Sequence, residues 1–314
     1  MKKILRLGTR GSPLALVQAE EVRNKIFAAH PGLQHDTEIE LTPIRTAGDW
    51  KPEHKERSFA LLGGNRDLFT KEIEDALLTG YIDIAVHSMK DVATVLDPRI
   101  AIAALLERAD PRDAFIGHSA RALETLPEGA TVGSASLRRQ AQILVKRPDL
   151  RVVPLRGNVD TRLGKLAKGQ VDATILAVAG LARLGAFNRI SSILDVATML
   201  PSACQGVIGV EARRDDEQAQ KLLAPLGHAA TSACVAAERA FVKALEGSCN
   251  TPIAALAQIG KDGMLRLEGL AARPDGSEIV RQDNSGPPAE AAQLGATLGE
   301  DLKSRLPPDF FAAA

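Results

Sequence analysis

The sequence predicts an α/β protein with a smaller α+β domain at its C-terminal end. Strand and helix patterns alternate through most of the chain, the strands are continuous apolar runs, and the pattern changes after residue 224. Continuous apolar runs between helices are typical of parallel strands buried on both faces. A chain of 314 residues with 45% hydrophobic content is long enough for two or three domains.

The first part of the chain reads as a strand–helix unit. We expect strands over 4–9, 39–45, 82–88 and 100–106. Ser12-Pro13 should open a helix that runs to about residue 29, because serine caps free backbone amides and proline suits a first helical turn. Thr70 should open a second helix, with acidic residues near its positive end.

A second unit follows a predicted turn at 109–114. Its expected strands are 131–135, 151–156 and 173–179; helices start at Ser136 and Asn158, and the last strand leads to a Gly-Leu turn. The tail reads as a helix (231–246), three strands (252–260, 264–273, 278–283) and a last helix (289–306). The predicted domains are 1–105 plus 200–223, then 106–199, then 224–314.

Composition restricts the classes of function. Lys+Arg and Asp+Glu number 39 each, so no overall charge draws the chain to nucleic acid or to an anionic membrane, and 3% aromatic content offers few stacking platforms. No apolar run reaches about 18 residues, and no signal-peptide cleavage site follows the basic start. Three cysteines are too few for a disulfide framework. We therefore expect a cytoplasmic protein, a monomer, with no metal site.

Arginines gather at the predicted ends of strands. The chain has 25 Arg and 14 Lys, and Arg binds carboxylates with a planar two-pronged fork. Six arginines follow strands of the two units: Arg10, Arg138, Arg139, Arg156, Arg162 and Arg183. Ligands of open α/β sheets bind beyond the carboxyl ends of the strands. A single arginine there is more often a solvated charge, but the set indicates a cleft for a ligand with several carboxylates.

Three further features stand out. His87, Lys90 and Asp91 follow the strand at 82–88, which allows either a surface ion pair or a carboxylate that acts on a proton or a positive charge. The charged stretch 50–67 reads as a mobile lid or a disordered loop. Among the cysteines, Cys249 lies in a loop that could present a nucleophilic thiol, Cys234 should pack in the core, and Cys204 is ambiguous.

The motifs RLGTRGSPLALVQA, DIAVHSMKDV, ADPRDAF, SASLRRQAQ, LRGNVDTRL, TILAVAGL and EGSC, in this order, resemble the porphobilinogen deaminase (hydroxymethylbilane synthase) family from about residue 4 to 306. The resemblance implies two domains like those of periplasmic binding proteins plus a third domain. It also implies a transferase of haem and other tetrapyrrole biosynthesis, which joins four porphobilinogen units head to tail with loss of ammonia.

The resemblance implies roles for single residues. Cys249 would hold a dipyrromethane cofactor through a thioether, and Asp91 would be the catalytic carboxylate. The cofactor's acid groups would be bound by Lys90, Ser136, Arg138, Arg139 and Arg162, and those of the substrate by Arg10, Arg156 and Arg183. Departures from the family pattern are GGNRDLF in the lid, Ala93, Cys204 before Gln205-Gly206, and Ser248, Asn250 and Thr251 around the cysteine.

Two other classes of protein compete with this one. A non-catalytic binding protein could use the same two-domain clamp, but an export signal is then expected. A nucleic-acid-binding protein would need a basic face and aromatic side chains. A family member that binds porphobilinogen without turning it over stays possible from the sequence.

Overall fold

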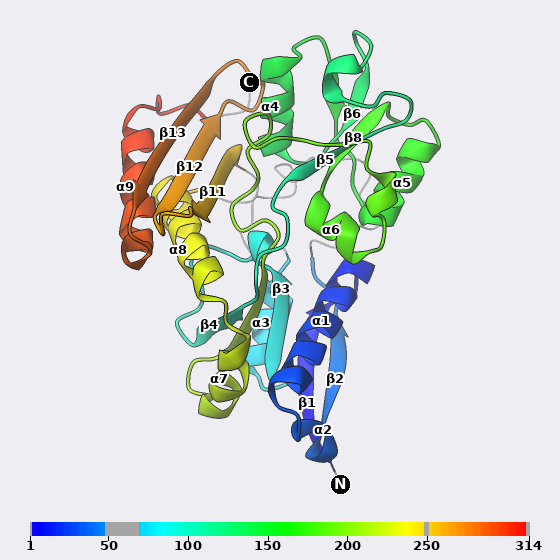
Figure 1. Ribbon diagram of the computed structural model, residues 1–314. Helices are drawn as coiled ribbons and strands as arrows, with labels where there is room; N and C mark the ends of the chain where they lie inside the picture. Colours follow the sequence, from blue (N-terminus) through cyan, green and yellow to red (C-terminus); the bar gives the residue numbers. More distant parts are fainter. Residues whose placement is uncertain (1, 48–68, 248–250, 312–314) are drawn as a thin grey trace. The chain divides into compact units, whose positions relative to one another are not determined.

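The computed structural model describes residues 2–47, 69–247 and 251–311 (Figure 1). The described chain divides into two compact units. Unit 1 holds residues 2–47, 69–109 and 206–232, and unit 2 holds 110–205, 233–247 and 251–311. The chain thus passes from one unit to the other at 109/110, at 205/206 and at 232/233. The predicted domain bounds stay a prediction.

Unit 1 is built on one five-stranded sheet in the order β2-β1-β3-β10-β4. Its strands are β1 (Lys3–Arg10), β2 (Thr37–Ile44), β3 (Ile84–Ser88), β4 (Ile100–Leu105) and β10 (Ile208–Arg213). The first four run parallel, as alternation with helices predicts, but β10 is antiparallel to both β3 and β4. The expectation of a purely parallel sheet was therefore wrong, because β10 enters from unit 2 rather than through a helical crossover.

Helices cover both faces of this sheet. They are α1 (Pro13–Ala29), α2 (Leu33–Asp36), α3 (Lys71–Leu78) and α7 (Glu217–Leu223), with 3-10 turns η3 (Met89–Asp91) and η6 (Ala224–Leu226). The Ala15 amide donates to Ser12 Oγ at 3.3 Å, so the predicted cap of α1 is confirmed. Val22 of α1 packs in one core cluster with Leu7, and Ile73 of α3 packs in another.

Unit 2 repeats the arrangement in the order β7-β6-β8-β5-β9. Its strands are β5 (Asp113–Gly117), β6 (Thr131–Gly133), β7 (Arg151–Val153), β8 (Ala173–Ala177) and β9 (Ser192–Ile193). Here β5 is the antiparallel strand, in the fourth place of the order like β10 in unit 1. Each antiparallel strand starts shortly after the chain enters its unit. The turn expected at 109–114 is wrong at its end, because Asp113 already belongs to β5.

The helices of this sheet are α4 (Leu137–Lys146), α5 (Val159–Ala167) and α6 (Val178–Arg183), with 3-10 turns η4 (Leu123–Thr125) and η5 (Phe187–Arg189). Ser136 and Asn158 accept from the backbone amides of Arg139 and Thr161, which confirms both predicted helix starts. The Gly-Leu turn expected after β8 is wrong. Residues 178–183 form α6, whose buried small and apolar side chains are packed in the unit.

The C-terminal part is α+β, as predicted. An antiparallel sheet of β11 (Ile253–Ile259), β12 (Leu265–Ala272) and β13 (Ile279–Gly286) is accompanied by α8 (Ala229–Ala244), η7 (Pro288–Glu290) and α9 (Ala291–Ser304) (Figure 1). Successive residues of β11 alternate between two cores: Ala255 packs with α8 and α9, and Ala254 packs with Ala141 of α4. The small sheet is therefore covered on both faces.

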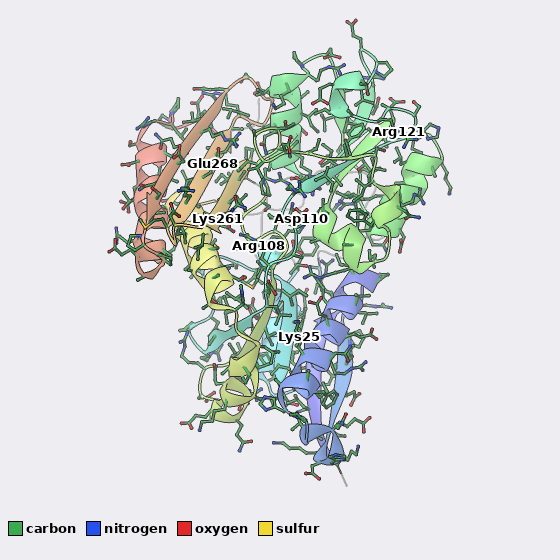
Figure 2. All side chains as sticks on the ribbon, viewed as in Figure 1. Lys25, Arg108, Asp110, Arg121, Lys261 and Glu268 are labelled. Carbon is green, nitrogen blue, oxygen red and sulfur yellow. The ribbon has the colours of Figure 1, made fainter. Side chains whose placement is uncertain are left out.

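Arg281 links the small sheet to the rest of unit 2. Glu268 of β12, labelled in Figure 2, pairs with Arg281 of β13. The same guanidinium donates to the carbonyl oxygens of Val196 and Ala197 at 3.1 Å each. These bonds fasten β13 to the segment that precedes the crossing at 205/206.

Candidate active site

In unit 1 two of the predicted site residues meet at one edge of the sheet. Because β1 and β3 are adjacent and parallel, Arg10 at the end of β1 and Asp91 just after β3 lie on the same side. Arg10 Nη1 is 4.0 Å from Asp91 Oδ2, and the two side chains are 23% and 30% exposed. The guanidinium also lies 4.3 Å from the ring centroid of Phe69, within cation–π range. A half-buried carboxylate with a neighbouring cation can therefore face a ligand here.

The turn that carries Lys90 and Asp91 is anchored by β10. The Met89 amide donates to the Val207 carbonyl at 3.0 Å, and the Met89 side chain is 1% exposed. A Cβ at Gly209 would come within 2.0 Å of Met89 Sδ, so a larger residue there would displace this side chain. The sequence of β10 thus fixes the position of Asp91, which no pattern in HSMKD alone could show.

In unit 2 the predicted arginines share an edge for the same reason. The strands β7, β6 and β8 are adjacent and parallel, so their carboxyl ends meet. The residues that follow these ends are Ser136, Arg138 and Arg139 after β6, Arg156 and Arg162 after β7, and Arg183 in α6 after β8. The Ser136 side chain caps α4 by accepting from the Arg139 amide at 3.4 Å.

The arginine pair of α4 is held by a carboxylate that the sequence analysis missed. Asp113 is fully buried, and its two oxygens accept from Arg138 Nη2 and Arg139 Nη2 at 2.8 Å each. Gln205 Nε2 donates to the same carboxylate at 2.9 Å, and Arg138 Nη1 donates to the Leu200 carbonyl at 2.7 Å. Asp113 and Arg138 therefore connect the arginine pair to the segment before the crossing at 205/206.

The charges of this cluster explain its protonation. Burial by itself would raise the pKa of Asp113. The positive charges of Arg138 and Arg139, with hydrogen bonds from Arg139 and Gln205, outweigh burial and hold that pKa well below its usual range. Asp113 is thus ionised, and the cluster has two guanidinium charges for one carboxylate.

This cluster fits a ligand with carboxylate groups. Arg139 is 6% exposed, and its Nε atom, which is buried, has no hydrogen-bond partner within the described residues. A buried donor without an acceptor is costly, and a ligand carboxylate could satisfy it and balance the remaining positive charge. Arg138, whose two Nη atoms are bonded to the protein, serves mainly to support its neighbour.

The remaining cations of unit 2 lie around the loop after β7. The Arg156 side chain is only 2% exposed, so it is no surface charge. Arg162 Nε donates to the Gly157 carbonyl at 2.9 Å, and Lys165 Nζ donates to the Arg156 carbonyl at 3.0 Å. Gly157 has φ +115, and a Cβ there would come within 2.6 Å of Thr161, so this tight loop requires glycine. Lys165 is a cation that the sequence analysis did not single out.

Two predicted features lie outside the described residues: the lid at 50–67 and Cys249. Cys234 is buried in the core with α8, as predicted. Cys204 is also buried, with φ +61, the left-handed conformation that glycine adopts easily. The backbone at this point therefore keeps the form suited to the glycine usual in the family pattern.

Comparisons with known proteins show the family of the chain. Residues 5–221 match the family model "Porphobilinogen deaminase, dipyromethane cofactor binding domain", and residues 232–304 match "Porphobilinogen deaminase, C-terminal domain". The chain is 48% identical over 307 residues to porphobilinogen deaminase of Paracoccus denitrificans, covering 98% of this chain and 96% of the relative. It is also 48% identical over 310 residues to the chloroplastic enzyme of Oryza sativa, covering 98% of this chain and 86% of the relative.

Solved structures are matched more distantly. A TRAP periplasmic solute-binding protein of Desulfovibrio salexigens is 12% identical, with a TM-score of 0.44, and the match covers 72% of this chain and 73% of that protein. The family models and the two relatives span nearly the whole chain. The chain therefore belongs to the porphobilinogen deaminase (hydroxymethylbilane synthase) family, the transferases of tetrapyrrole biosynthesis that use a dipyrromethane cofactor.

Proposed function

We propose that Asp91 is the catalytic carboxylate of the family's reaction, the stepwise condensation of four porphobilinogen molecules with release of ammonia. In each step the C–N bond of the aminomethyl group breaks, and its electron pair leaves on nitrogen as ammonia. The remaining azafulvene is electrophilic and carries developing positive charge. A carboxylate beside it stabilises that charge. The observation that carries the proposal is the half-buried Asp91 carboxylate, 4.0 Å from Arg10 at the sheet edge.

The new C–C bond then forms, and the acceptor pyrrole carbon must lose a proton. Asp91 is suited to take this proton and pass it to solvent, where the ammonia released earlier takes up one proton as ammonium, so no net proton is consumed. Arg10 lies beside the carboxylate and would hold an acid group of the incoming porphobilinogen.

The growing chain gains two carboxylates with every ring. In unit 2, Arg139 would bind one of them through Nε, with Arg138 and Asp113 as its support. The further cations proposed for these acid groups are Arg156, Arg162 and Arg183. Each charge-assisted hydrogen bond contributes about 1.5–3 kcal/mol, so a few such contacts hold a chain of several acid groups.

The dipyrromethane cofactor fits this donor set, because it carries carboxylates and the described site offers an orphaned buried guanidinium nitrogen. Lys90, Ser136, Arg138, Arg139 and Arg162 would hold it, and we propose Cys249 as its covalent thioether anchor. When bound, it supplies the pyrrole carbon to which the first substrate is joined.

The remaining properties follow from composition. A balanced 39 against 39 charges and 3% aromatic content support an enzyme without a nucleic-acid or membrane partner. We also propose that the enzyme is a cytoplasmic monomer. Among the described helices none is long and apolar enough to cross a bilayer.

The test is Asp91→Asn, with turnover of porphobilinogen measured beside thermal unfolding. We expect turnover to fall by about 100-fold or more, with unfolding unchanged. The matched control is Asp97→Asn, since Asp97 lies in the same unit and pairs with its neighbour Arg99 at the surface. Near-normal activity of Asp91→Asn would remove Asp91 from the catalytic role.

A further inference from the structure

A second carboxylate lies buried behind the catalytic turn. His87, near the end of β3, and Glu211, in β10, have their Nε2 and Oε2 atoms 3.2 Å apart, and their side chains are 2% and 0% exposed. In the antiparallel register His87 lies opposite Gly209, and Glu211 lies two residues further along β10 on the same face.

The surroundings favour a charged imidazole ring. Neither oxygen of Glu211 accepts a hydrogen bond from any group within the described residues, so the ring of His87 is its compensating group. An ionised carboxylate buried without a partner is strongly unfavourable. The other titratable groups that act on His87 are Glu74 of α3 and Asp91 of η3, and both are acidic.

These interactions set the protonation of His87. Burial by itself would lower its pKa, but the contact with Glu211, and then the charges of Glu74 and Asp91, outweigh burial and raise the pKa above its ordinary value. The electrostatic interaction between His87 and Asp91 is mutual, so loss of the imidazolium charge would also change the electrostatic environment of Asp91.

The strands β3 and β10 also position the turn Met89–Asp91, which contains Asp91. Met89, two residues after His87, is bonded to Val207 and packs against Gly209. Met89 directly follows β3 and Val207 directly precedes β10, so this contact lies next to the strands that the His87–Glu211 pair joins. A shift of β3 against β10 would move Asp91.

We infer that His87, as an imidazolium paired with Glu211, is a positioning residue that holds the Met89–Asp91 turn on β10 and keeps a positive charge behind Asp91. This inference rests on the proposed catalytic role of Asp91. The pair acts through the turn and needs no contact with substrate.

The inference has a defined pH dependence. The folded pKa of His87 is raised above its unfolded value, so the stabilisation is fully present below about pH 6.5. It is lost as the pH rises through the folded pKa. Turnover and the unfolding temperature of unit 1 should therefore fall together on the alkaline side.

The direct test is imidazole NMR of the ¹⁵N-labelled holoenzyme, with His87→Gln used to assign the signal. We expect both ring nitrogens of His87 to be mostly protonated at pH 6.5, because its pKa is raised above that ordinary value. In Glu211→Gln the midpoint of the His87 titration should fall by about one pH unit or more, which is a tenfold change in proton affinity. A His87 that is mostly neutral at pH 6.5, or a titration midpoint of His87 that is unchanged in Glu211→Gln, overturns the inference.

The functional arm uses His87→Gln combined with Glu211→Gln, which removes both charges at nearly constant volume. We expect kcat to fall about tenfold or more through misplacement of Asp91, with KM little changed and the alkaline limb of the kcat profile altered. His35→Gln is the control and should leave the profile unchanged. A double variant with the wild-type kcat and pH profile contradicts the positioning role.

The two proposals fail separately. If Asp91→Asn stays active while His87 is protonated, the role of Asp91 is refuted and the buried ion pair stands. If Asp91→Asn is inactive while His87 is neutral, only the present inference falls.

Discussion

Replacement of Asp113 by asparagine tests how the arginine pair is held. Asp113 is fully buried and accepts from Arg138, Arg139 and Gln205 at 2.8, 2.8 and 2.9 Å. An asparagine side chain would have one acceptor oxygen for three donors, its amide group would face other donors, and two buried guanidinium charges would lose their counter-charge. Breaking a buried pair in this way costs about 3–5 kcal/mol.

The assay is differential scanning calorimetry of the full chain. For a unit of this size about 1 kcal/mol corresponds to roughly 2–4 °C, so the transition of unit 2 should fall by about 6–20 °C. The transition of unit 1 should stay in place, since Asp113 and its three partners all belong to unit 2. Intact mass should show less cofactor bound, because Arg139 loses its support.

Asp110→Asn is the matched control. Asp110, labelled in Figure 2, lies three residues earlier and pairs with Arg112 at 2.6 Å, with side chains that are 29% and 39% exposed. Exposed pairs contribute about 0–1 kcal/mol, so unfolding should shift by no more than roughly 4 °C. Equal shifts in the two variants would refute the reasoning that the buried cluster holds unit 2 together.

The dependence of the unfolding free energy on acidic pH gives an independent check of the role of Asp113. The folded pKa of Asp113 is depressed, so its stabilisation is present above the unfolded pKa of about 4 and is lost only as the pH falls through the much lower folded value. The difference in unfolding free energy between the wild type and Asp113→Asn should therefore be constant from pH 7 to about 5. It should shrink below that range.

Three further outcomes are expected. Asp91→Asn should lose about 100-fold or more of turnover and keep its unfolding temperature. Gly209→Ala should push Met89 aside, because the new Cβ would lie 2.0 Å from Met89 Sδ. Steady-state kinetics should then show a drop in kcat of about tenfold, and an unchanged kcat would show that the turn tolerates the shift. Arg139→Leu should impair cofactor assembly or chain elongation, which mass spectrometry would show as stalled enzyme–pyrrole species. Arg138→Leu should chiefly lower thermal stability. Equal stalling in both variants would contradict the different roles of the two arginines.

Local signals predicted the local structure well. Ser12, Ser136 and Asn158 cap their helices as expected, because capping depends only on the neighbouring three residues. Period-2 and apolar patterns likewise placed the strands of the α+β part, whose two faces pack on different cores.

The missed features depend on distant partners. The strands β5 and β10 lie in the middle of sheets whose other strands are parallel, and their direction follows from where the chain enters each unit. Asp113 in a Pro-Arg-Asp segment looks like a turn residue, and only the fold shows that it faces Arg138 and Arg139. Glu211 reads as an ordinary charged residue until β10 pairs with β3 and brings it to His87.

Position at strand ends found the arginines but could not assign them. It treated Arg138 and Arg139 as equals, whereas the bonds to Asp113 and Leu200 distinguish a supporting arginine from one with a buried donor to spare. A motif gives the type and order of residues, whereas the hydrogen-bond partners of each side chain depend on the three-dimensional fold.

The intact mass of the purified protein tests the central claim most directly. The wild type should carry the added mass of one dipyrromethane, which Cys249→Ser should lose together with activity. Cys204→Ser and Cys234→Ser, which alter the two buried thiols, should keep the added mass. An active wild-type enzyme without added mass, or a Cys249→Ser variant that retains it, would contradict the account.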